Sequence, residues 1–218
     1  MIRIHRLYST FLPSDRDRME QVKTIFRQSF PGVADYADKI ADQLEHPFAA
    51  QFLSSRGRVA VLDIDYHHGN GTQDIFYRRG DVLTVSLHGH PNIAYPYFSG
   101  FADETGEEGG KGFNLNLPLA EHTDGDGYLK ALDRALAALR RYKPSCLIVS
   151  LGFDTLKGDP TGSFTLSTRT MTEIGRNIAK LGLPMLFVQE GGYNLRNLRS
   201  GVVRLFDGVA QGVASSHP

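Results

Sequence analysis

From Arg58 onwards the chain alternates short apolar runs with amphipathic segments, and this alternation restricts the fold more than any other feature. Four runs have the near-continuous apolar character of strands covered on both faces, at residues 58–62, 82–87, 146–151 and 184–188. Apolar residues at helical spacing predict helices over 128–139, 171–181 and 198–209. Strands that alternate with helices pair in parallel through right-handed crossovers. We therefore predict an α/β fold, a three-layer open parallel sheet flanked by helices.

The first fifty residues follow a different, more polar pattern. A capping sequence at 14–17 and apolar residues up to Phe26 predict one helix, and residues 36–44 predict a second. Residues 49–55 are typical of a short helix that ends at Gly57. The sequence thus predicts a helical N-terminal segment over 1–50, of open role, followed by an α/β domain over 51–218.

Composition excludes several classes of partner and location. Lys plus Arg and Asp plus Glu each number 24, so the formal charge is zero and neither nucleic acid nor an acidic membrane is expected as a partner. The one cysteine, Cys146, cannot form a disulfide within the chain and fits a reducing compartment. No apolar stretch approaches the roughly 18 residues of a membrane span, and the first thirty residues lack the apolar core of a signal peptide. A cytoplasmic protein is expected.

Polar side chains follow the predicted strands where those strands end. These segments are Asp63–His68, Ser86–His88, Gly152–Asp154 and Glu190–Tyr193. Open parallel sheets bind ligands beyond the carboxyl ends of their strands, so carboxylates, imidazoles and a phenol should meet at one rim.

Three of these residues have the pattern of a metal site. Asp65 and His67 are two positions apart as a strand runs out, which places them on one side, and Asp154 comes from another strand. Three protein ligands with one open position is the layout of a catalytic zinc. The nitrogen and oxygen donors suit zinc but leave iron and cobalt open.

Simpler interpretations exist for each residue alone. A single Asp after a strand usually caps a helix, and His67-His68 beside Gly-Asn-Gly is compatible with a polar turn. The acidic stretch 103–108 is typical of a solvated loop, although Glu107 and Glu108 would also suit a mouth that attracts cations. The combination at three separate strand ends favours a functional site.

The stretch from Leu62 to Gln73 resembles the metal-binding signature of the histone deacetylase superfamily. Within that superfamily the chain is most similar to the bacterial acetylpolyamine amidohydrolases and class II-like deacetylases. The resemblance covers about residues 50 to 210, and its further motifs are 86–89, 112–118, 150–154 and 190–194.

The resemblance implies a role for each matching residue. Asp65, His67 and Asp154 match the ligands of a single zinc ion, Asp63 a carboxylate that orients a catalytic histidine, and Tyr193 the phenol that stabilises the oxyanion. Tyr95, Gly191 and Gly192 match residues that bind the substrate. Structural potassium sites are implied in two places: around Asp63, Asp65, His67, Ser86 and Leu87, and around Phe76, Arg79 and Val82.

The implied activity is zinc-dependent removal of acetyl, or another short acyl group, from an acylamine such as an acetylpolyamine or from an acetyl-lysine peptide. Assembly into a homo-oligomer is left open.

The sequence departs from the family before Arg58. The family carries a Gly-His-His segment whose histidines act as general base and proton shuttle, whereas residues 1–57 contain only His5 and His46. The chain resembles an N-terminally truncated member, and loss of a general base costs about 10²–10⁴ in rate. We therefore predict zinc binding with poor turnover, and the alternative is a catalytically impaired metal-binding module. A binuclear manganese ureohydrolase is disfavoured because it needs further bridging carboxylates.

Overall fold

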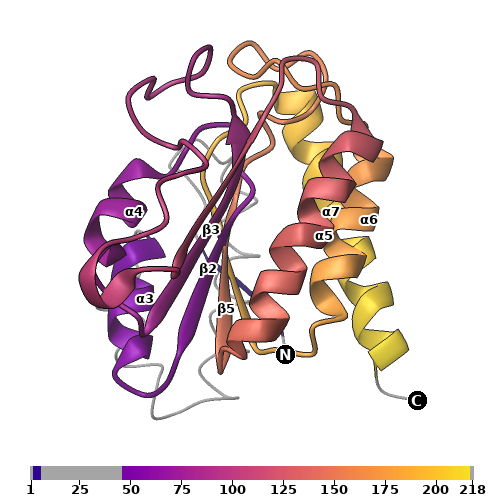
Figure 1. The fold of residues 1–218 in the computed structure, drawn as a ribbon. Helices are drawn as coiled ribbons and strands as arrows, with labels where there is room; N and C mark the ends of the chain where they lie inside the picture. The colour runs from indigo at the N-terminus through magenta and orange to yellow at the C-terminus, as the bar shows by residue number, and fades with distance from the viewer. Residues whose placement is uncertain (1, 6–45, 217–218) are drawn as a thin grey trace.

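A computed structural model describes residues 2–5 and 46–216 of the protein. Six strands of the described residues form one sheet in the order β1-β6-β5-β2-β3-β4, and every neighbouring pair is parallel. Figure 1 labels the central strands β5, β2 and β3. The strands are β1 (Ile2–His5), β2 (Val59–Asp63), β3 (Val82–Gly89), β4 (Asn114–Leu119), β5 (Cys146–Leu151) and β6 (Met185–Gln189). The predicted fold class, an open parallel sheet flanked by helices, is confirmed.

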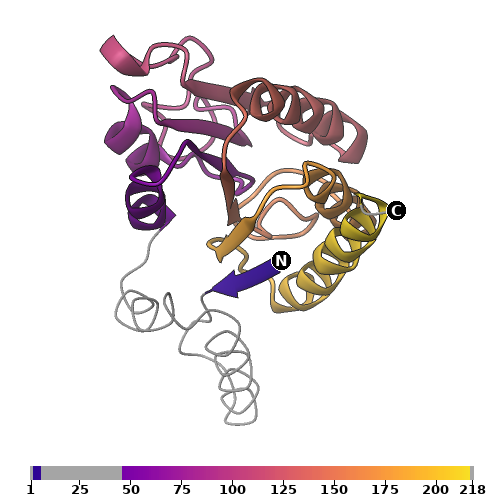
Figure 2. The same ribbon diagram turned by 90° about the horizontal axis from the view of Figure 1, so that it is seen from below.

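Helices cover both faces of this sheet. Figure 2 shows α3 (His46–Ser54) and α4 (Asn70–Phe76) on one face, and α5 (Gly125–Tyr142), α6 (Thr168–Ala179) and α7 (Leu195–Ser216) on the other. A single turn of 3₁₀ helix, η1 (Glu108–Gly110), precedes β4. Among the described residues, no helix is both long enough and apolar enough to cross a bilayer.

The two-residue period of β2 explains its continuous apolar sequence. Val59 and Val61 pack with Phe76 in a core beneath α3 and α4. Ala60 and Leu62 belong to the larger core that α5, α6 and α7 cover. Because both faces of the strand are buried, every position is apolar until Asp63 reaches the rim.

Local signals set the limits of α5. The Asp124 side chain accepts a hydrogen bond of 2.9 Å from the Gly127 amide and caps the first turn. Lys143, in a left-handed conformation with φ of 53°, ends the helix. The helix therefore runs its full length down one face and returns the chain to the start of β5.

The beginning of the chain corrects one expectation. Residues 2–5 form strand β1 and pair with Met185–Val188 of β6, so this part of the segment 1–50 is not helical. The helices predicted at 14–26 and 36–44 lie outside the described residues. The short helix predicted at 49–55 is present as α3, which begins three residues earlier than expected.

Candidate metal centre and pocket

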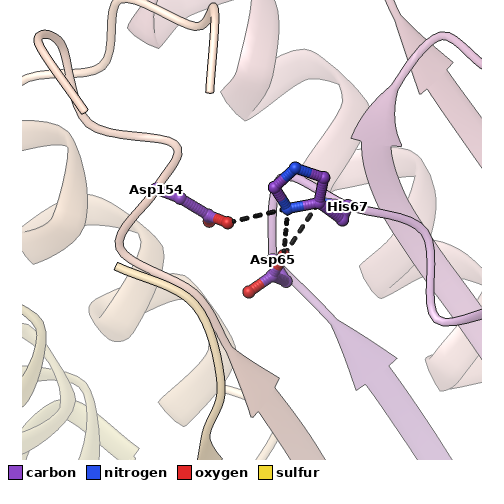
Figure 3. Close-up of side chains that lie close together, drawn as sticks. All are labelled: Asp65, His67 and Asp154. Carbon is purple, nitrogen blue, oxygen red and sulfur yellow. Dashed lines mark hydrogen bonds and ion pairs between the residues drawn. The ribbon is translucent and has the colours of Figure 1, made fainter. Parts of the chain in front are cut away.

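Asp65, His67 and Asp154 meet at the carboxyl rim of the sheet. Asp65 and His67 follow β2, and Asp154 follows the adjacent strand β5 (Figure 3). His67 Nδ1 lies 3.0 Å from Asp154 Oδ2 and 3.3 Å from Asp65 Oδ1. One donor atom from each residue lies within 4.8 Å of the other two. The expected convergence of these three side chains is thus present.

Backbone amides fix the two carboxylates. Asp65 Oδ1 accepts from the His67 amide at 2.8 Å, and its Oδ2 accepts from the Gly191 amide at 2.8 Å. Asp154 Oδ1 accepts from the Tyr66 amide at 3.0 Å. The remaining lone pairs are thereby aimed at the shared space, which a metal site requires.

The charges in this cluster favour a cation. Burial raises the pKa of Asp154 to about 7, and the negative charge of Asp65 adds to the rise. Burial also acts against the charged form of Asp65, but its hydrogen bonds, from His67 first and then with Asp154 and the Gly191 amide, leave the pKa of Asp65 lowered. Burial alone would lower the pKa of His67, yet its hydrogen bonds to Asp154 and Asp65 raise that pKa to about 10. Two adjacent buried carboxylates are thus stabilised by a positive charge between them.

Glycines allow the backbone to approach the carboxylates closely. A Cβ added at Gly191 would lie 2.4 Å from Asp154 Oδ2 and 2.5 Å from Asp65 Oδ2. A Cβ at Gly152 would lie 2.2 Å from Asp65 Oδ2. Gly192 has φ of 132°, a conformation that other residues rarely adopt. Glycine is therefore required directly after β5, at Gly152, and shortly after β6, at Gly191.

The donor set fits a zinc ion. One imidazole nitrogen and two carboxylate oxygens lie within 4.8 Å of one another. Zinc accepts these nitrogen and oxygen donors, with one position left open in catalytic sites.

A pocket of about 430 Å³ opens beside the cluster. Six of the predicted site residues line it, namely Asp63, Asp65, His67, Tyr95, Gly191 and Tyr193. The side chains of Tyr95 and Tyr193 are exposed at 58% and 60%, and the Tyr95 ring lies 6.4 Å from that of His67. Asp154 is fully buried behind the pocket and Gly192 lies in the turn beneath it.

Further lining residues were not predicted as site residues. They are His68, Gly69, Ser150, Thr161 and Glu190. Glu190 was recognisable as the first polar residue after β6, whereas Thr161 lies in a loop with no periodic pattern to place it.

Asp63 lies at the floor of the pocket. It is buried, and its Oδ1 accepts from the Asp65 amide at 3.0 Å. Its register partners on the two adjacent strands are Ser86 and Ser150. This position agrees with a carboxylate beside the metal cluster.

Other histidines serve the structure. His88 is fully buried; its Nδ1 lies 2.7 Å from Ser86 Oγ, and its Nε2 donates to the Gly100 carbonyl at 2.9 Å. His90 Nδ1 accepts from the Asn92 amide. His68 packs against His88 with ring centroids 4.4 Å apart, and burial lowers the pKa of His68 to about 4. Within the described ranges, only His67 and His68 bring imidazoles to the pocket.

The acidic loop lies away from the pocket. Glu107 and Glu108 approach Arg78 at 3.1 and 3.7 Å, between the end of α4 and the start of β3. Glu104 instead turns inward and accepts from Gln73 Nε2 at 2.6 Å and from the Gly100 amide at 2.9 Å. These contacts favour the surface-loop interpretation over a cation-attracting mouth.

Comparison with known proteins decides the family. A model described as the histone deacetylase domain matches residues 47–209. The chain belongs to the histone deacetylase family.

Relatives in the histone deacetylase family include acetylpolyamine amidohydrolase 1 of Pseudomonas aeruginosa, 51% identical over 151 residues, which are 69% of this chain and 44% of that protein. The acetylpolyamine amidohydrolase of Mycoplana ramosa is 43% identical over 164 residues, 74% of this chain and 48% of that protein. The crystal structure of acetylpolyamine aminohydrolase from Burkholderia pseudomallei superposes with a TM-score of 0.75 at 43% identity, covering 76% of this chain and 49% of the other. The chain spans about half the length of these histone deacetylase family relatives.

Proposed function

We propose that this chain is a zinc-dependent amidohydrolase that removes acetyl or another short acyl group from an amine. The observation that carries the proposal is the convergence of Asp65, His67 and Asp154 beside a 430 Å³ pocket. Relatives named acetylpolyamine amidohydrolase favour a small acylamine as substrate, with an acetyl-lysine peptide second.

Asp65, His67 and Asp154 would hold the ion. A zinc ion held there would supply a Lewis acid for the amide carbonyl and for the attacking water. The buried carboxylates and their backbone amide partners keep the donors in place before the ion arrives. One zinc per chain is therefore proposed.

Tyr193 is proposed as the donor to the oxyanion. Its exposed phenol lies at the pocket, on a turn that Gly191 and Gly192 bring against the metal cluster. One such donor commonly contributes about 10²–10³ in rate. Tyr95, also at the pocket mouth, is proposed to contact the acyl-bearing amine, and Asp63 to accept a hydrogen bond from a proton-transfer group.

Potassium, location and assembly are proposals of the same kind. Asp63 and Ser86 are buried polar residues near the metal cluster, which supports a potassium site there. A second potassium site is proposed near Phe76, Arg79 and Val82. The single thiol supports a cytoplasmic location. A homo-oligomer would be consistent with the exposed aromatic residues at the pocket mouth.

The alternative function is a metal-binding module with little catalytic power. It is favoured by the histidines of the described residues: His67 belongs to the metal cluster, and His68 is buried with a pKa of about 4. His88, the other candidate base, has both ring nitrogens engaged. Neither His68 nor His88 therefore has the place and basicity of an efficient proton acceptor.

Metal analysis and turnover of the full chain test the two functions together. We expect one tightly bound zinc and hydrolysis of N-acetylputrescine well below the usual enzyme median of about 10 s⁻¹. The rate should rise with pH through ionisation of the attacking water and show no second, histidine-like limb. Asp154→Asn should abolish both zinc binding and hydrolysis.

Each result separates the possibilities. Zinc bound with no turnover on acetylpolyamines or acetyl-lysine peptides leaves the metal-binding module. Two manganese ions per chain, or no metal, would refute the proposal. Turnover near the enzyme median would mean that an efficient base exists and that the predicted impairment is wrong.

A further inference from the structure

A buried carboxylate outside the metal cluster connects two sides of the pocket. Asp159 is 6% exposed and lies in the loop between Asp154 and α6. Its Oδ2 accepts from the amides of Tyr193 at 2.7 Å and Asn194 at 3.1 Å. Its Oδ1 accepts from the amide and hydroxyl of Thr161 at 3.0 and 2.9 Å. Four donors thus satisfy one buried anion, and such charge-assisted bonds are stronger than neutral ones.

The segment that Asp159 binds carries the proposed oxyanion donor. Tyr193 follows Gly192, whose φ of 132° leaves this turn without the stiffness of an ordinary residue. The Tyr193 side chain is 60% exposed, so its ring is not enclosed by the core. The hydrogen bond from the Tyr193 amide to Asp159 fixes the backbone from which the phenol projects.

A second contact strengthens the same connection. Asn194 Nδ2 donates to the Gly158 carbonyl at 3.1 Å, and Asn194 Oδ1 accepts from the Arg196 amide at the start of α7. The loop that contains Gly158 and Asp159 thus binds the turn at Tyr193 and Asn194, and α7 begins directly after that turn.

The loop is itself fixed to the metal cluster. A Cβ added at Gly162 would lie 1.9 Å from the Asp154 carbonyl oxygen, so the loop backbone rests directly on that residue. The Phe153 amide also donates to the Gly191 carbonyl at 2.9 Å. Asp159 therefore stands between a proposed metal ligand and the proposed oxyanion donor, and it can hold the distance between them.

We infer that Asp159 is a positioning residue that fixes the Tyr193 phenol relative to the metal cluster through hydrogen bonds to the Tyr193 and Asn194 amides. The inference rests on the proposed function, because it assigns Asp159 to the geometry of that reaction. Misplacement of a reacting group by about 1 Å can cost 10²-fold in rate.

A double-mutant cycle on the zinc-loaded full chain tests the role. Asp159→Asn should lower kcat for N-acetylputrescine by about 10- to 100-fold, with little change in KM or zinc affinity. In a Tyr193→Phe background the same change should have almost no further effect, because the group that it positions is gone. Asp124→Asn, which removes a carboxylate that also accepts a backbone amide, is the matched control and should leave kcat unchanged.

Several outcomes would overturn the inference. Losses from Asp159→Asn and Tyr193→Phe that multiply would show that Asp159 acts on something else. A parallel fall in zinc affinity would assign Asp159 to the metal cluster or to general stability.

A readout without turnover separates this inference from the proposed function. Hydrogen exchange of the metal-free chain should show faster exchange, by at least about tenfold, for the Tyr193 and Asn194 amides in Asp159→Asn and Asp159→Ala. Protection elsewhere, for example in β2 and β5, should be retained. Unchanged exchange at residues 193 and 194 would refute the positioning role, whether or not the chain hydrolyses amides.

Discussion

At the scale of single residues, His88 is a histidine whose neutrality the fold requires. It is fully buried between Ser86 and the Gly100 carbonyl. Burial lowers its pKa to about 3, and the neighbouring charge of His68 acts in the same direction. In the unfolded chain the pKa returns to about 6.5.

The consequence is a loss of stability in mild acid. Between pH 6.5 and about 3 the unfolded state binds a proton that folded His88 does not, so the free energy of unfolding falls as pH falls through this window. The slope from one such group is at most about 1.4 kcal/mol per pH unit. Urea unfolding at pH 7 and pH 5 should show a smaller pH difference for His88→Gln than for the unmodified chain. An identical difference would show that His88 does not contribute.

The sequence could predict the metal cluster but not the loop that supports it. Asp65, His67 and Asp154 each follow a buried apolar run, and parallel pairing brings such positions to one rim. Asp159 lies in a stretch with no strand or helix period, where a carboxylate after Gly158 is as compatible with an exposed turn as with a buried anchor. Glu104 was similarly placed in a solvated loop, although it binds Gln73. The placement of Asp159 and that of Glu104 both depend on hydrogen-bond partners that are distant in the sequence.

At the scale of elements, strands covered on both faces were the easiest to predict. β5 has the expected bounds, and β2, β3 and β6 differ by one or two residues at their ends. The sequence does not predict β4 as a strand, because Asn114 and Asn116 interrupt the apolar run and a proline such as Pro118 is largely confined to edge strands such as this one. β1 is four residues long and gains its structure from pairing with β6, a long-range interaction that local pattern cannot reveal.

The turn after β6 should tolerate no side chain at its first glycine. Gly191→Ala would push a methyl group onto the carboxylates of Asp65 and Asp154. We expect zinc affinity to fall by about 10- to 100-fold, the range for altered partners of metal ligands. Competition with a chromophoric chelator measures the change.

Gly71→Ala provides the matched control within α4. A Cβ at Gly71 meets no atom within 4 Å, and alanine favours a helix over glycine by up to about 1 kcal/mol. The control should keep full zinc affinity and gain slightly in stability. Equal zinc affinity in both variants would show that the close approach at Gly191 is unimportant.

At the scale of the whole molecule, a metal held by Asp65, His67 and Asp154 should stabilise the folded chain. His67 and Asp154 are 87 positions apart, so the unfolded chain cannot present them together. Zinc at 100 times its dissociation constant then adds about 2.7 kcal/mol. For a chain of this size the melting temperature should rise on the order of 5 °C.

Thermal unfolding with and without zinc measures this coupling. Asp154→Asn should unfold at the same temperature in both conditions. A zinc-dependent rise that survives in Asp154→Asn would place the metal elsewhere.

The pairing of β1 with β6 has a consequence for synthesis on the ribosome. Strand β1 (Ile2–His5) cannot pair until Met185–Val188 of β6 has been synthesised. At about 5–20 residues per second, synthesis of the intervening chain takes on the order of ten seconds or more. Register partners on β2 and β3, such as Asp63 and Ser86, are 23 positions apart, so these two strands can pair long before β5 and β6 emerge. The rim that carries Asp154 and the Gly191 turn can therefore be completed only after β6 has been synthesised. The Gly191 amide binds the Asp65 carboxylate, so a metal held by Asp65, His67 and Asp154 is expected to bind in full only once translation has passed β6.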